Sequence, residues 1–147
     1  MTTEVVRRLF DLDLWIVGTA HFVILFASFQ VPYRLGWKRD LAQLIPFNRK
    51  LLWVQGGFTV LTIVAFGTLT LVLHEEMLRG DRAALALICF IGVYWTARIV
   101  VDAVYFSHAD WPKGPAFSVG HVLLTTLFSF LAASYVGLFA WHVWRKS

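Results

Sequence analysis

Arg98 and Asp102 stand four residues apart in the third of four long apolar stretches of this chain. Residues at this spacing share one face of a helix. A charged side chain inside a membrane costs about 2.5–3.5 kcal/mol on insertion scales, so its presence indicates a function. The two groups either form an internal ion pair that locks the helices together, or hold the polar head of a ligand with a forked guanidinium donor and a carboxylate acceptor.

Other side chains that form hydrogen bonds are expected at the same depth as this pair. They lie about one turn inside the other apolar segments or flank the pair on its own segment: Gln30, Gln55, His121, Tyr94 and Tyr105. The imidazole of His121 would be able to exchange a proton near neutral pH. These residues predict a polar pocket, although polar residues near helix ends also occur without a ligand.

His121 begins a row on the fourth apolar segment that continues at every fourth residue. The row runs through Thr125 and Ser129 to Ala133 and Gly137. Small residues at this spacing allow helices to approach closely in lipid. We therefore expect the small end of the row to pack against a neighbouring helix and to turn His121 and Thr125 inward.

The five histidines raise the alternative of haem, because paired imidazoles on facing helices ligate haem iron. His21, near the middle of the first segment, is either a hydrogen-bonded core residue or part of a site. It would lie about 18 Å from the helix end that His121 approaches to about 8 Å, so these two are poorly matched as axial ligands. His74 and His142 share a level, but at helix ends near water. No metal site is expected, and no cofactor is required.

The elements that would position these groups are four spanning helices, over residues 14–33, 51–73, 82–107 and 116–144. A helix of roughly 20 apolar residues crosses the hydrocarbon core of a bilayer. Short links favour an antiparallel up-down-up-down bundle. We therefore predict an all-α membrane protein of one domain, residues 1–147, with residues 34–50 as an interfacial connector.

Composition supports this class: 59% of residues are hydrophobic, and the net charge of +4 comes from basic residues beside the apolar segments. Such residues face lipid headgroups, so we expect a bilayer and no nucleic acid as partner. The single cysteine excludes a disulfide within the chain. A bacterial-type inner membrane is expected. Orientation is undecided, since each side has six basic flanking residues, but the first helix favours termini outside.

No sequence signature indicates a reaction or a catalytic residue. This favours binding over catalysis, so an enzyme is the less expected interpretation. The leading expectation is a small accessory or structural subunit of a membrane complex, with a membrane-protein partner or a homo-oligomer. One alternative is a binding protein or enzyme for a lipid-soluble molecule, such as a quinone, an isoprenoid or a lipid headgroup, held in the polar pocket. The other is a haem-binding redox protein.

Overall fold

Long apolar runs become helices in this chain because a helix satisfies every backbone N–H and C=O within its own segment. The computed structural model describes residues 3–106 and 114–146, apart from the side chains of residues 31, 116 and 146. Its four long helices are α1 (Thr3–Arg34), α3 (Pro46–Val72), α5 (Arg82–Tyr105) and α6 (Pro115–Lys146). Each is long and apolar enough to cross a membrane. The prediction of an all-helical chain with four such helices is confirmed, and the described residues include no strand.

Three short helices connect the long ones: α2 (Trp37–Asp40), η1 (Leu41–Gln43) and α4 (His74–Arg79). Gly80 ends α4 at a φ of 72°, a conformation that favours glycine. The sequence predicts a turn over the residues of α4, and the structure has a short helix there.

Two helix starts differ from the expected bounds. Helix α1 begins at Thr3 rather than near residue 14, because polar residues continue it and include an exposed Arg8–Glu4 ion pair one turn apart. Helix α3 begins at Pro46 rather than near residue 51. Proline suits the first turn of a helix, whose N–H groups have no partner within the helix. Pro46 therefore starts α3 instead of ending the connector.

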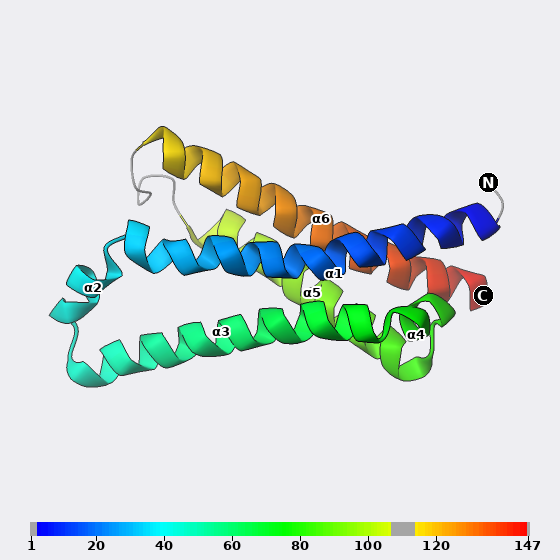
Figure 1. Cartoon of the computed structure of the whole chain (residues 1–147), viewed down its shortest axis with the longest axis horizontal. Helices are drawn as coiled ribbons and strands as arrows, with labels where there is room; N and C mark the ends of the chain where they lie inside the picture. Colours follow the sequence, from blue (N-terminus) through cyan, green and yellow to red (C-terminus); the bar gives the residue numbers. More distant parts are fainter. Residues whose placement is uncertain (1–2, 107–113, 147) are drawn as a thin grey trace.

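Figure 1 shows both chain ends at one end of the molecule, where α4 also lies, and α2 at the opposite end. Helix α1 packs mainly on α3, and α5 packs mainly on α6. The two pairs are joined by contacts of α1 with α6 and with α4. The long helices thus form two pairs that meet near the chain ends.

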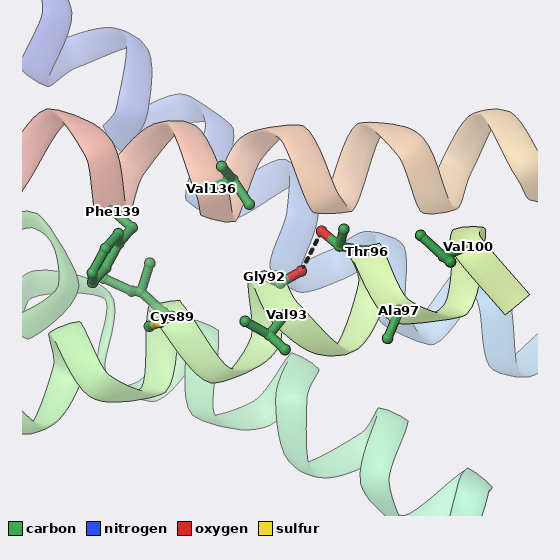
Figure 2. A pocket seen from close by; sticks show the side chains of 9 residues that line it. Cys89, Gly92, Val93, Thr96, Ala97, Val100, Val136 and Phe139 are labelled. Atoms are coloured by element: carbon green, nitrogen blue, oxygen red, sulfur yellow. Dashed lines mark hydrogen bonds between the residues drawn. The ribbon is translucent and has the colours of Figure 1, made fainter.

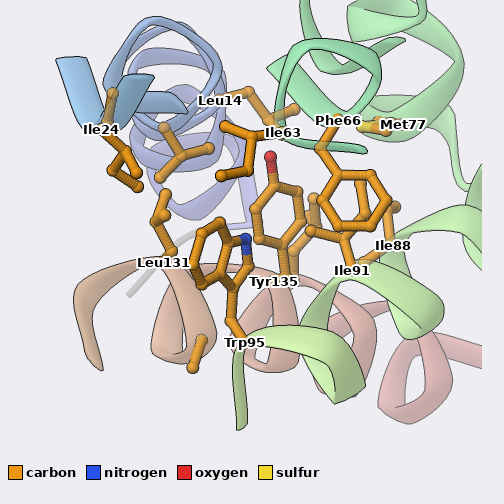
Figure 3. Close-up of a cluster of buried hydrophobic side chains, with 14 of the residues drawn as sticks. Leu14, Ile24, Ile63, Phe66, Met77, Ile88, Ile91, Trp95, Leu131 and Tyr135 are labelled. Atoms are coloured by element: carbon orange, nitrogen blue, oxygen red, sulfur yellow. The ribbon is translucent and has the colours of Figure 1, made fainter. Parts of the chain in front are cut away.

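Among the described residues, the buried ones all lie in the part of the molecule nearer the chain ends, which we call the packed half: residues 14–25 of α1, 63–72 of α3, α4 with Gly80, 84–95 of α5 and 131–142 of α6. Its apolar core includes Leu14, Ile24, Ile63, Phe66, Met77, Ile88, Ile91, Trp95, Leu131 and Tyr135 (Figure 3). Glycines allow α1 and α3 to touch there. A Cβ on Gly67 would lie 2.9 Å from the Cβ of His21, and one on Gly18 would lie 2.6 Å from Leu71.

The remaining part of the long helices contains no buried side chain among the described residues, and we call it the open half. It comprises residues 26–34 of α1, 46–62 of α3, 96–105 of α5 and 115–130 of α6. Figure 1 shows α1, α3 and α6 spread apart at this end. A Cβ added at Gly56, Gly57 or Gly120 would meet nothing within 4 Å. Space therefore remains beside these three glycines.

Candidate functional site

Asp102, His121 and Thr125 form a polar group between α5 and α6 in the open half. Asp102 Oδ2 lies 3.8 Å from His121 Nε2 and accepts a hydrogen bond from the Thr125 hydroxyl at 3.5 Å. The same hydroxyl lies 3.5 Å from His121 Nδ1. The side chains of Asp102 and His121 are 18% and 25% exposed, so both are partly withdrawn from the surroundings. This group brings together two of the residues predicted from the sequence and adds Thr125.

Arg98 lies one turn from Asp102 on α5 and keeps its guanidinium over the ring of Phe128, 5.5 Å from the ring centre. Phe128 in turn stacks on Trp95, with ring centres 5.0 Å apart. Asp102 is engaged with α6 instead, and no described residue forms an ion pair with Arg98. The shared helix face is present, but the internal Arg98–Asp102 lock considered from the sequence does not form.

Three other predicted residues do not join this group. Gln30, Gln55 and Tyr105 are exposed in the open half, and Tyr105 is 80% exposed. Tyr94 is half-buried and packs edge-on against Phe66 and Trp95. The expected layer with contributions from all four helices is therefore not assembled by these residues, and α1, α3 and α6 spread apart at this end (Figure 1).

His21 is fully buried in the packed half, where it belongs to a separate network. The indole N–H of Trp95 donates to His21 Nε2 at 3.1 Å. The neutral ring therefore carries its hydrogen on Nδ1, which donates to the Val17 carbonyl at 2.7 Å. Both ring nitrogens are satisfied within the protein, so His21 is a hydrogen-bonded core residue that links α1 to α5.

Two further side-chain contacts between helices escaped the sequence analysis. The Thr70 and Tyr135 hydroxyls lie 2.6 Å apart and join α3 to α6, and both residues are buried. The Ser134 hydroxyl donates to Asp13 Oδ1 at 3.0 Å and joins α6 to α1. The available signal was the spacing of Leu131, Tyr135 and Leu138, which are all buried on one face of α6.

The two histidines near the chain ends are buried, which corrects the expectation that they lie near water. His74 is 6% exposed, and its Nε2 lies 3.2 Å from both the backbone oxygen and Oδ1 of Asp11. His142 is 2% exposed and donates its Nε2–H to the Met77 carbonyl at 2.8 Å. Helix α4 and the extended start of α1 cover them.

The partners of the histidine ring nitrogens bear on whether these histidines can ligate haem iron. The Nε2 atoms of His21, His74 and His142 each face a partner within the protein, so none is directed at an open space that a haem would fill. Among the described residues, no three or more His, Cys, Asp or Glu side chains are grouped so as to hold a metal ion. Within the described part of the chain, these three histidines therefore do not pair as the axial ligands of a haem.

The row of small residues on α6 faces a different direction from the one expected. Ser129 and Ala133 are exposed, while Leu131, Tyr135 and Leu138 form the packing face. Four residues advance roughly 40° beyond a full turn of a 3.6-residue helix, so a row at this spacing winds around the helix. It starts inward at His121 and Thr125 and reaches the outer surface farther along.

An apolar groove of about 480 Å³ lies on the α5–α6 surface (Figure 2). It is lined by Ile88, Cys89, Gly92, Val93, Thr96, Ala97, Val100, Val136 and Phe139. The Thr96 hydroxyl is occupied by a hydrogen bond to the Gly92 carbonyl at 2.8 Å. No charged side chain lines this groove, which can take only an apolar occupant.

Comparison of the chain with protein-family models, with curated proteins and with solved structures found no match.

Proposed function

We propose that the chain is an integral membrane protein whose four long helices cross the bilayer in alternating directions as an antiparallel bundle. The length and apolar character of α1, α3, α5 and α6 support insertion. The position of both chain ends at one end of the molecule supports the alternating order. We also propose a bacterial-type inner membrane, with the termini outside because the flank after the first helix is richer in basic residues than the flank before it.

We further propose that the open half binds a lipid-soluble molecule with a polar head, such as a quinone, an isoprenoid or a lipid headgroup. The single observation that carries this proposal is the polar group of Asp102, His121 and Thr125, with Arg98 beside it, in a part of the bundle that has no buried side chain. Charged groups within membranes mark ligand or ion sites because their insertion is unfavourable. We propose binding and no reaction.

Extraction of the protein into polymer nanodiscs together with its surrounding lipid tests this function. Mass spectrometry of the bound small molecules should show one class enriched over the bulk lipid. The Arg98→Leu/Asp102→Leu double variant should lose that enrichment, whereas Thr96→Val, on α5 but in the outer groove, should retain it. Equal retention by the double variant would contradict binding at these residues.

An accessory or structural subunit, the leading expectation from the sequence, remains the second candidate. The observation that favours it is the extensive apolar exposure of the open half, where Phe26 is 74% and Phe47 is 71% exposed. A spanning segment of another chain would bury such surfaces. The same nanodisc sample distinguishes the two proposals. A partner chain present in equal amount, with no enriched small molecule, supports the subunit role and overturns the binding role.

A further inference from the structure

The chemical class of the ligand can be narrowed from the charges that line the open half, an inference that rests on the binding function proposed above. Away from the helix ends, its described residues hold one cation and one carboxylate, Arg98 and Asp102. Residues 26–33 of α1, 51–62 of α3 and 115–130 of α6 contain no Asp, Glu, Lys or Arg. The formal charges of these two side chains sum to zero.

An anionic head would be poorly held by this arrangement. Its oxygens would lie near the Asp102 carboxylate as well as near Arg98, and like charges repel strongly where water is scarce. Phosphate sites in proteins commonly use several cationic or backbone donors, whereas Arg98 is the one charged donor away from the helix ends among the described residues of this half. The charge balance favours a neutral head.

The same residues offer both donors and acceptors. The Arg98 guanidinium donates no hydrogen bond to any described residue and has its donors available for a ligand. Asp102 uses Oδ2 toward His121 and Thr125, and its Oδ1 accepts no hydrogen bond from a described residue. A ligand that fits must therefore carry an oxygen that accepts a hydrogen bond from Arg98 and a hydroxyl group that donates a hydrogen bond to Asp102.

The position of Arg98 also favours a planar head. Its Cζ lies over the Phe128 ring, and guanidinium groups stack on planar rings. Arg98 is otherwise exposed, so a ligand ring can reach it. The uncharged stretches of α1 and α3 complete the open half with surfaces suited to a hydrocarbon tail.

We infer that the open half binds a neutral, lipid-soluble ring compound that carries hydroxyl groups, the quinol class. The ring lies beside Arg98; one hydroxyl oxygen accepts a hydrogen bond from the Arg98 guanidinium, and one hydroxyl group donates to Asp102 Oδ1. His121 and Thr125 hold the Asp102 carboxylate in place from α6.

The test measures binding of three probes to the full chain in phosphatidylcholine nanodiscs: a decyl-substituted benzoquinol kept reduced, oleate and a short prenyl phosphate. Arg98→Leu and Asp102→Leu should each weaken quinol binding about tenfold, the loss expected for one hydrogen bond to a charged group. Asp102→Asn keeps an acceptor oxygen and should weaken it less. Thr96→Val should leave the affinity unchanged, and circular dichroism verifies that each variant is folded.

The sign of the Asp102→Leu effect separates the ligand classes. An anionic ligand should bind more tightly to this variant, because a repelling carboxylate has been removed, whereas a quinol should bind more weakly, because its hydroxyl group has lost an acceptor. Tight binding of oleate or prenyl phosphate that improves in Asp102→Leu, with no quinol binding, would overturn the quinol class and leave the proposed function standing. Quinol binding that neither Leu variant changes would overturn the site. If none of the three probes binds but the natively extracted protein retains an enriched molecule, the quinol class is overturned. If the natively extracted protein also retains no enriched molecule, the proposed function fails as well.

Discussion

At the scale of single residues, the buried hydrogen bond from Trp95 to His21 is the contact whose loss should be measured first. Trp95→Phe retains the aromatic packing but leaves His21 Nε2 without a donor in the core. An unsatisfied buried acceptor costs about 1–3 kcal/mol, so we expect the free energy of unfolding, measured with denaturant in mixed micelles, to fall by that amount. Trp144→Phe is the matched control, because Trp144 is 84% exposed. Equal effects of the two substitutions would contradict the network.

The Thr70–Tyr135 pair should show coupling in a double-mutant cycle. Thr70→Val and Tyr135→Phe each remove one hydroxyl of a buried contact that joins α3 to α6. Side-chain hydrogen bonds between membrane helices couple by about 0.6 kcal/mol on average and up to about 1.7 kcal/mol. We expect the single substitutions to destabilise and the double variant to lose less than their sum. Additive effects would show that the hydroxyls act independently.

Residue spacing in the sequence was sufficient to place some of these side chains. The predicted helix positions brought Asp102 near His121, because both lie toward the same end of adjacent helices. The partners of His21 and the Thr70–Tyr135 contact depend on how each helix is rotated about its own axis. Rotation is set by complementary packing of large side chains such as Trp95 and Leu131, which hydropathy does not describe.

At the scale of helices, the crossing of α1 over α3 depends on a glycine. Gly67→Ala would place a methyl group 2.9 Å from the His21 Cβ and 3.1 Å from the Gly18 carbonyl oxygen. Forcing a methyl group into a close-packed contact costs about 1–3 kcal/mol. Gly57→Ala, on the same helix but in the open half, meets nothing within 4 Å and should be neutral or stabilise by up to about 1 kcal/mol. Thermal unfolding of both variants in detergent measures the difference. An equal change in both would contradict the close crossing.

Hydropathy predicted the existence of the four long helices and left their ends less well defined. The start of α1 is helical although charged residues interrupt its apolar ones, since ion pairs along its surface and the covering of His74 do not depend on hydropathy. Pro46 was ambiguous for a related reason, because proline is suited both to ending one helix and to beginning the next.

At the scale of the whole molecule, the alternating order of the helices predicts that both chain ends lie on the same side of the membrane. Reporter fusions at the N-terminus and at the C-terminus should give the same activity pattern, and a reporter inserted between α2 and α3 should give the opposite one. The connector there lies at the far end of the molecule from both termini. Opposite signals from the two terminal fusions would contradict four crossings.

The division into a packed and an open half could not be derived from the sequence. Apolar residues continue along all four helices, and the same hydropathy fits a half closed on itself and a half spread apart. What distinguishes them is shape. Leu131, Tyr135, Trp95 and Phe66 fill the packed half, whereas a Cβ added at Gly56 in the open half would meet nothing within 4 Å.

An experimental structure of the protein in nanodiscs formed directly from native membrane tests most directly whether the open half is a ligand site. We predict non-protein density between α3 and the α5–α6 pair, in contact with Arg98 and Asp102, while the packed half keeps the Trp95–His21 hydrogen bond. An open half closed by its own side chains, or filled by a helix of another chain with no other density beside Arg98, would contradict the account.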